Sequence, residues 1–246
     1  MTATNRLLYG AIMVLAVVVA WLLLRKRQFK MELDFHQRSG LAYAGFVGAM
    51  LGAKAPFLLE ADWDSIGNST LWLSDGKTIL GGIFGGYLSI EIAKWVMGIH
   101  QKTGDSYAIP LAAAIAIGRL ACFVAGCCYG TTTTLPWGCY FPLAQDPPGT
   151  HRHPTQLYEV AFHLSALFLL WIAEQRGWLV HQRLKAYLMA YLIYRFATEW
   201  VRPEPILAAG LTGYQFACIV LWILLAALWV RDRENPSVDS SIDLRT

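Results

Sequence analysis

Charged residues are scarce in this sequence, which excludes a soluble domain of ordinary composition. Asp, Glu, Lys and Arg make up 15% of the 246 residues, whereas apolar residues make up 56%. The chain also lacks internal repeats, a linker long enough to divide two domains, and the basic or aromatic surface pattern typical of nucleic-acid binding. The composition therefore indicates a polytopic membrane protein that does not bind nucleic acid.

The five cysteines lack the paired spacing of a zinc site. Cys122 and Cys127 are separated by four residues within or at the end of a predicted helix, and no Cys-x-x-Cys pair accompanies them. Structural zinc sites are usually built from such closely spaced pairs. The spacing therefore predicts no zinc site.

Seven apolar stretches approach or exceed the roughly 20 residues that a helix needs to cross a bilayer. They are residues 7–24, 40–60, 79–98, 108–126, 155–174, 185–201 and 211–230. We expect an all-α fold with a single transmembrane domain over residues 1–233 and a short outer loop at about 131–153. The polar tail, residues 234–246, is predicted to be disordered. The first stretch lacks a basic leader and a clear cleavage site, so we expect a membrane helix rather than a cleaved signal peptide.

Basic residues flank these stretches unevenly. Twelve follow the odd-numbered stretches: Arg25, Lys26, Arg27, Lys30, Arg38, Lys102, Arg176, Arg183, Lys185, Arg231, Arg233 and Arg245. Four lie on the other side: Arg6, Lys77, Arg152 and Arg202. Because Lys and Arg concentrate in cytoplasmic loops, the bias predicts an outer N-terminus and a cytoplasmic C-terminus.

The same topology places four of the five cysteines toward the outer, oxidising side of the membrane. One interpretation is a disulfide that joins Cys139 to Cys127 or Cys128. The other is that the cysteines are free thiols, packed as small apolar groups. The sequence leaves both interpretations open.

Charged side chains within the predicted spans indicate a functional site, because an unpaired charge in a bilayer is energetically costly. Arg119 lies in the fourth stretch, below the predicted outer surface, and requires an anionic partner. Gly118, Gly126 and Gly130 lie near it in the sequence. Since glycine has no Cβ, these positions would let backbone or a lipid headgroup approach closely.

The sixth stretch carries Tyr191, Arg195, Glu199 and Arg202 at offsets of four, four and three residues. This spacing predicts one stripe on a single helical face, which is typical of the lining of a cavity. The alternative is a self-contained ladder in which Glu199 bridges both arginines. One carboxylate cannot fully neutralise two guanidiniums, which favours the cavity.

The fifth stretch carries a comparable stripe formed by Gln156, Glu159 and His163. Thr155 immediately precedes these residues and is a candidate cap for the start of the helix. We expect His163 to be a hydrogen-bonded interior histidine rather than a catalytic base.

A phosphate group is the expected ligand of Arg119 and Arg195, because these two arginines are not matched by an equal number of acids nearby. Guanidinium–phosphate pairing is strong and geometrically specific. A transporter or channel is the main alternative from another class. Such proteins favour broken helices and polar residues spread across the midplane, whereas the polar residues here gather in the outward half.

Five sequence runs resemble those of the prolipoprotein diacylglyceryl transferases in order and spacing. They are GRLACFVAGCCYG, TTTTLPWGCYFP, RHPTQLYE, YLIYRFATEWVRPEP and TGYQ. Upstream, three further runs are similar to the first three helices of the family: LLYGAIMVLAVVVAWLLLRKR, LAYAGFVGAMLGAK and GGIFGGYLS. The resemblance covers nearly the whole chain, and the combination of motifs is highly specific.

The resemblance implies an enzyme of the bacterial inner membrane whose active site faces the outer leaflet. The reaction that it implies moves the diacylglyceryl group of phosphatidylglycerol to the lipobox cysteine thiol of a preprolipoprotein signal peptide. A thioether forms and glycerol phosphate is released. The implied partners are phosphatidylglycerol, the preprolipoprotein and membrane lipids, with no metal and no cofactor.

The resemblance and the polar pattern together give two sets of candidate site residues. The catalytic set is Arg119, Arg195, Glu199, Glu159 and Cys127. The substrate-binding set is Tyr9, Gly118, Cys122, Gly126, Gly130, His153, Gln156, Tyr191 and Arg202.

The sequence departs from the family at three of its usual positions. Phe84 stands where the family usually has a histidine, and Cys122 and Cys127 stand where its signature usually has asparagine and glutamate. The resemblance therefore implies a retained phosphate-holding half of the site and an altered proton-handling half.

Three interpretations remain open. The first is a diacylglyceryl transferase with another base, for which Glu159, Glu199, His153 and a cysteine thiolate are candidates. The second is a divergent enzyme that uses phosphatidylglycerol with another acceptor, through a covalent intermediate on Cys127 or Cys128. The third is a non-catalytic phospholipid-binding protein, since a shared fold does not fix function.

Overall fold

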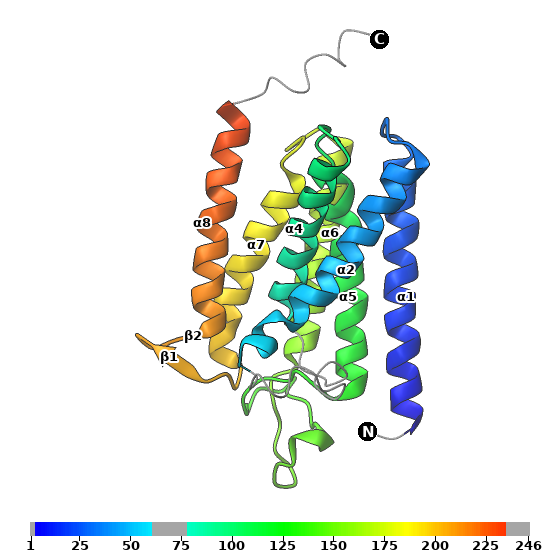
Figure 1. Cartoon of the computed structure of the whole chain (residues 1–246). Helices are drawn as coiled ribbons and strands as arrows, with labels where there is room; N and C mark the ends of the chain where they lie inside the picture. The colour runs from blue at the N-terminus through cyan, green and yellow to red at the C-terminus, as the bar shows by residue number, and fades with distance from the viewer. Residues whose placement is uncertain (1–2, 61–77, 235–246) are drawn as a thin grey trace. The chain divides into compact units, whose positions relative to one another are not determined.

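The structure, a computed structural model, describes residues 3–60 and 78–234 (Figure 1). The predicted disordered tail therefore lies outside the described residues, apart from Glu234. The chain divides into two compact units. One unit comprises the chain up to Arg27 and from Lys102 onward, and the other comprises Gln28–Gln101. The single transmembrane domain over residues 1–233 remains a prediction.

The described residues contain seven α-helices, which confirms the all-α class. They are α1 (Ala3–Gln28), α2 (Phe35–Glu60), α4 (Ile79–Val96), α5 (Gly104–Ala125), α6 (Thr155–Gln175), α7 (Arg183–Thr198) and α8 (Gly213–Glu234). Two short 3-10 helices, η2 (Pro142–Ala144) and η3 (Glu199–Val201), lie in the connections. A small antiparallel hairpin of β1 (Ile206–Ala208) and β2 (Leu211–Thr212) precedes α8 and was not predicted.

Five of these helices are long and apolar enough to cross a membrane: α1, α4, α5, α6 and α8. The chain is therefore a multi-pass membrane protein. The α7 helix has 16 residues and carries the charged stripe, so length and hydropathy alone do not identify it as a span. The count of seven spans remains a prediction.

Within the unit Gln28–Gln101, α2 and α4 pack through glycine at very short range. A Cβ atom placed on Gly52 would lie 2.3 Å from the carbonyl oxygen of Gly81, and one on Gly85 would lie 2.4 Å from that of Gly48. Only residues without a Cβ allow two helix backbones to approach this closely, as in other membrane helix pairs. The Thr78 hydroxyl accepts a hydrogen bond from the Gly81 amide at 3.2 Å and caps α4.

In the other unit, α5 packs against α6 and α7, and α7 packs against α8. The face of α5 that packs inward is rich in alanine, including Ala108, Ala112, Ala116 and Ala121. These small side chains let the helices come close along most of their length. Two helices of this unit, α5 and α7, end where two others, α6 and α8, begin (Figure 1). Buried polar residues lie on these four helix ends.

Candidate active site

Buried polar side chains from four helices form one cluster in this unit. Arg195, Glu159 and Glu199 are 2%, 0% and 1% exposed, and Arg119 is 8% exposed. Tyr191, Gln156 and Gln215 are also buried beside them. Groups of this polarity remain inside a membrane protein only when they are paired or serve a ligand.

Glu159 on α6 is the centre of one half of the cluster. Its carboxylate forms ion pairs with Arg119 of α5 and with Arg202, whose Nη2 lies 3.4 Å from Oε2. The Tyr191 hydroxyl of α7 donates a hydrogen bond to Oε1 at 3.1 Å. One carboxylate therefore holds two guanidiniums that come from distant parts of the sequence.

Glu199 is the centre of the other half. It pairs with Arg195 one turn earlier, and its Oε1 accepts a hydrogen bond from the Thr212 hydroxyl at 2.9 Å. The Arg195 guanidinium also lies over the ring of Tyr214, 4.7 Å from its centroid.

The prediction of one four-residue helical stripe is wrong at Arg202. The α7 helix ends at Thr198, Glu199–Val201 forms a 3-10 turn, and Arg202 is extended, with φ −111° and ψ 146°. Arg202 therefore turns toward Glu159 of α6. The alternative ladder, in which Glu199 would bridge both arginines, is not formed, because Arg202 has this other partner.

The cluster carries more positive than negative charge. Three guanidiniums, those of Arg119, Arg195 and Arg202, share the carboxylates of Glu159 and Glu199. The three arginines and Glu159 all lie close enough to Tyr191 and Tyr194 to act on them electrostatically. The ion-paired groups therefore carry one excess positive charge in a buried setting, and the partly buried Glu204 lies near them but outside these pairs.

Several polar atoms of the cluster have no hydrogen-bond partner within the described residues. They include the Nε atoms of Arg195 and Arg202, the Tyr194 hydroxyl and Gln156 Oε1. Buried polar atoms rarely remain unsatisfied, so these atoms are available to water or to a bound ligand. The arginine and tyrosine donors suit an anion with several acceptor oxygens, such as a phosphate.

The turn after α5 is tied to the start of α6. The Gln156 amide donates a hydrogen bond to the Cys127 carbonyl at 2.6 Å, and the Thr155 hydroxyl donates one to the Cys128 carbonyl at 2.7 Å. The prediction that Thr155 caps its helix is therefore wrong. Thr155 is the first helical residue, Pro154 occupies the cap position, and the hydroxyl is used to hold the neighbouring turn.

All five cysteines are free, as the free-thiol interpretation expects, but only Cys218 is buried and Cys128 is exposed, so they are not all packed as small apolar groups. The Sγ atoms of Cys122, Cys127 and Cys128 lie within 4.8 Å of one another. Hydrogen bonds from the Cys122 and Cys127 thiols lower the pKa of Cys128, and the nearby charges of Arg119 and Arg202 lower it further. This convergence of three thiols is not evident from the sequence spacing of the cysteines, which predicts no zinc site.

Gly130 and His153 join the loop to η3. The Gly130 amide donates to the His153 carbonyl at 2.8 Å, and a Cβ on Gly130 would lie 2.4 Å from the Val201 carbonyl oxygen. Gly130 thus permits a close backbone approach. His153 Nδ1 lies 3.1 Å from the hydroxyl of Tyr158.

Three other predicted residues lie on or next to the helices of this unit. Gly126 ends α5 in the left-handed conformation, with φ 68°. Gly118 lies on α5, where a Cβ would lie 3.9 Å from Met13 of α1. Tyr9 also lies on α1. Their roles in substrate binding remain predictions.

Arg152 organises the outer loop. It donates two hydrogen bonds to the Asp146 carboxylate, at 2.5 and 2.8 Å, and one to the Gly130 carbonyl at 3.0 Å. Its guanidinium also lies 5.0 Å from the ring centroid of Tyr129. The hydrogen bonds from Arg152 lower the pKa of Asp146.

Sequence reasoning missed several residues of the cluster. Thr212 and Gln215 brace one another, because Gln215 Oε1 accepts from the Thr212 amide at 3.0 Å. Both belong to the TGYQ run, whose resemblance to the family does not by itself indicate this contact. Glu204 lies near Arg195 and Arg202, and burial raises the pKa of its carboxyl, with added repulsion from Glu199. His163 is an interior histidine as predicted, with Nδ1 2.9 Å from the Tyr187 hydroxyl.

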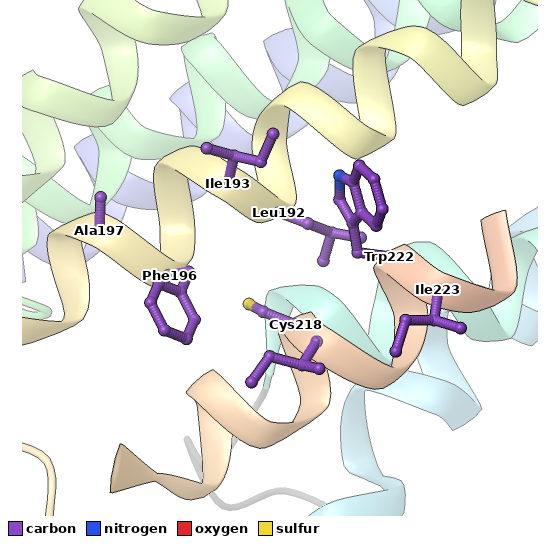
Figure 2. Close-up of a pocket in the computed structure, with 8 residues that line it drawn as sticks. Leu192, Ile193, Phe196, Ala197, Cys218, Trp222 and Ile223 are labelled. Atoms are coloured by element: carbon purple, nitrogen blue, oxygen red, sulfur yellow. The ribbon is translucent and has the colours of Figure 1, made fainter. Parts of the chain in front are cut away.

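An apolar groove adjoins the cluster between α7 and α8. Figure 2 shows that side chains of both helices face it, and its volume is about 380 Å³. The lining residues are Leu192, Ile193, Phe196, Ala197, Cys218, Ile219, Trp222 and Ile223. Leu192 and Phe196 flank Arg195 in the sequence of α7, so the groove runs alongside the helix that supplies this guanidinium.

A buried cluster of arginines and carboxylates beside an apolar groove, in a multi-pass helical protein, defines a membrane protein with a polar internal site. Comparison with known proteins specifies the class further. The profile of the family described as prolipoprotein diacylglyceryl transferase matches residues 5–231. The chain belongs to the prolipoprotein diacylglyceryl transferase family.

Individual relatives agree with this assignment. The chain is 34% identical over 210 residues to the phosphatidylglycerol–prolipoprotein diacylglyceryl transferase of Clostridium tetani, covering 80% of this chain and 81% of the relative. It is 31% identical over 235 residues to the enzyme of the same name from Legionella pneumophila, covering 90% of each. A second such transferase, from Clostridium perfringens, is 29% identical over 229 residues, covering 87% of this chain and 86% of the relative.

Proposed function

We propose that this chain transfers the diacylglyceryl group of phosphatidylglycerol to the lipobox cysteine thiol of a prolipoprotein. Family membership supports the reaction, and the excess of guanidinium over carboxylate in the buried cluster is the observation that carries it. Phosphatidylglycerol is an anion, and its phosphate becomes more negative as the leaving glycerol phosphate. A buried positive site favours that change.

The arginines hold the phosphate in this proposal. Arg119 and Arg202 are fixed by Glu159, and Arg195 is fixed by Glu199, so the donors are oriented before the lipid arrives. Preorganised donors stabilise developing charge without reorganising during the reaction. The unpartnered Nε atoms of Arg195 and Arg202 supply hydrogen bonds to phosphate oxygens.

The apolar groove between α7 and α8 takes one acyl chain of the lipid. It is lined by apolar side chains of α7 and α8, and α7 is also the helix that carries Arg195 (Figure 2). Alignment of the glyceryl carbon with the attacking sulfur then follows from the fixed position of both ends of the lipid.

Deprotonation of the acceptor thiol requires a group other than the two central carboxylates. Glu159 is held by two guanidiniums and a hydroxyl, and Glu199 by one guanidinium and a hydroxyl, so both are charge partners rather than unoccupied bases. Phe84 stands in place of the usual histidine of the family. The cysteine thiols beside Arg119 are the remaining groups of the site with thiolate chemistry.

We also propose that the site faces the outer leaflet of the inner membrane, in a protein of seven spans with an outer N-terminus. The basic end of α1 pairs with the end of α6, where Arg27 Nη2 lies 2.6 Å from Glu174 Oε2. Lys185 at the start of α7 pairs with Asp232 at the end of α8, also at 2.6 Å. Basic residues also fill the last turns of α1 and α8, namely Arg25, Lys26, Arg27, Arg231 and Arg233. Positive charge is therefore in excess at the end opposite the cluster, and the positive-inside rule assigns that end to the cytoplasm.

Complementation tests the function. The chain is expressed in a bacterium depleted of its own transferase, and the thioether on a lipobox peptide is measured by its mass shift. We expect growth and a diacylglyceryl adduct on the peptide cysteine. Correct membrane insertion without that adduct would contradict the proposal and favour another acceptor.

The covalent route through cysteine is tested separately. A lipid adduct trapped on Cys127 or Cys128 would support a covalent intermediate. Unchanged transfer by a Cys127→Ser, Cys128→Ser double variant would exclude it.

A further inference from the structure

Three thiols that the proposed phosphate site does not use converge beside it. The Sγ atoms of Cys122, Cys127 and Cys128 lie within 4.8 Å of one another, and those of Cys127 and Cys128 are 3.7 Å apart. The chain reverses direction between them, because Gly126 has φ 68° and Cys128 has φ 62°. This double left-handed turn brings both later cysteines back over the end of α5, which the spacing alone does not reveal.

The turn that carries these cysteines is held by other parts of the fold. The Cys127 amide donates to the Cys122 carbonyl at 3.1 Å, and side chains of Thr155 and Gln156 bind the carbonyls of Cys128 and Cys127. Left-handed backbone at a cysteine is unusual and is maintained only when surrounding contacts fix it. The three thiols are therefore held together by the fold.

We propose that Cys122, Cys127 and Cys128 form a three-thiolate site for one soft d10 metal ion, represented by Zn²⁺, whose fourth position binds the cysteine thiol of the acceptor. Zinc–sulfur bonds of about 2.3 Å in tetrahedral geometry place sulfur atoms roughly 3.8 Å apart. One sulfur pair already has this separation, and the others need to close by about 1 Å at most. Thiolate ligands favour ions of this class.

The charge of the surroundings fits such a centre. A divalent ion with three thiolates carries one net negative charge, and Arg119 lies within electrostatic reach of Cys122 and Cys128. Arg202 likewise acts on Cys128. Three protein ligands with an open fourth position are typical of catalytic rather than structural zinc sites. Cys128 is exposed, so the group of thiols is reachable from outside the helices.

The role of the fourth position rests on the proposed transferase function. The acceptor thiol binds the ion and releases its proton to solvent. Its sulfur then forms a bond to the glyceryl carbon of phosphatidylglycerol, while the carbon–oxygen bond to the phosphate breaks and the electron pair leaves with glycerol phosphate. The bound ion thus stabilises the thiolate in a chain whose sequence has Phe84 where the family usually has histidine.

Metal titration of the purified full-length protein, reduced and in detergent, tests the site itself. Cd²⁺ is the spectroscopic probe, because thiolate-to-cadmium charge transfer absorbs in the ultraviolet, and Zn²⁺ is counted by elemental analysis. We expect one ion per chain, with binding weakened about tenfold or more by Cys122→Ser, Cys127→Ser or Cys128→Ser. Cys139→Ser, a free cysteine outside the three-thiol group, is the matched control and should bind as the unaltered chain does.

Two results would overturn the metal site. One is the absence of saturable Cd²⁺ and Zn²⁺ binding by the folded protein. The other is binding that the three serine variants and the Cys139→Ser control share equally. Protein isolated without reductant can contain a disulfide between these cysteines. If such protein takes up no ion after reduction, saturable binding is absent and the metal site is overturned.

A lipobox peptide separates the acceptor role from the transferase function. Adding the cysteine peptide to the Cd²⁺-loaded protein should shift the charge-transfer band, whereas the peptide with serine at that position should not. Removing the ion with a chelator should lower transfer about tenfold, with phosphatidylglycerol binding unchanged. A band shift without transfer would contradict the transferase function alone. Transfer that is insensitive to the ion, with no band shift, would contradict the acceptor role alone.

Discussion

Replacing Arg119 by lysine retains the positive charge but removes the planar fork of the guanidinium. Arg119 reaches Glu159 through Nε, which leaves its two terminal nitrogens to bind a phosphate as a pair. A lysine ammonium cannot hold the carboxylate and both phosphate oxygens in that geometry. The variant therefore loses at least one charged hydrogen bond, worth about 1.5–3 kcal/mol.

This loss corresponds to a fall of about 10- to 150-fold in the rate of transfer at low lipid concentration. The assay measures diacylglyceryl transfer to a lipobox peptide by mass shift, with the enzyme in liposomes that contain phosphatidylglycerol. Circular dichroism and membrane insertion should be unchanged, because the charge that balances Glu159 is still present.

Arg27→Lys is the matched control. Arg27 pairs with Glu174, which lies 15 residues after Glu159 on α6 and therefore about 22 Å away along the helix. We expect near-normal transfer by this variant. Near-normal transfer by Arg119→Lys as well would refute the assignment of Arg119 to the phosphate.

Three further predictions concern the groove, the glycine interface and the outer loop. Ala197→Trp fills the groove between α7 and α8, so we expect the KM for phosphatidylglycerol to rise about tenfold while the fold is retained. An unchanged KM would exclude acyl-chain binding in this groove. Gly85→Leu places a side chain against the backbone of α2, so we expect it to lower the free energy of unfolding by about 2 kcal/mol or more in thermal unfolding. Gly98→Leu is the control, because a Cβ there contacts nothing. It should cost only about 1–2 kcal/mol, since its φ of 65° strains any residue other than glycine. Because the pKa of Asp146 is lowered in the folded protein, its contribution to loop stability is complete above about pH 3.9 and is lost as the pH falls further. Asp146→Asn should therefore speed amide exchange at Arg152 and Cys139 at pH 7, and its difference from the unaltered chain should shrink as the pH falls below about 3.9. Equal rates at pH 7 would contradict this role.

The helices could be predicted from sequence because each apolar run is long and bounded by charged or small residues. The convergence of Arg119 with Arg195 of α7 could also be predicted. Each arginine lies within an apolar stretch and requires an anion, and the predicted topology places both in the outer half of the membrane. Sequence periodicity works within one helix, where the spacing of side chains is fixed.

The missed features depend on where the backbone leaves helical geometry. Arg202 follows a 3-10 turn, so its pairing with Glu159 could not be read from offsets of four and three residues. The three thiols meet because Gly126 and Cys128 adopt left-handed conformations, which spacing rules do not include. Thr155 binds the Cys128 carbonyl rather than its own helix, because the turn after α5 lies within reach.

The central claim is that an excess guanidinium charge, buried among α5, α6 and α7, selects an anionic phospholipid. Native mass spectrometry of the purified protein with equal amounts of phosphatidylglycerol and a zwitterionic phospholipid of the same acyl chains tests it directly. We predict a preference of about tenfold or more for phosphatidylglycerol, which Arg195→Gln abolishes because this variant removes the excess charge. Equal binding of the two lipids by the unaltered chain would contradict the claim.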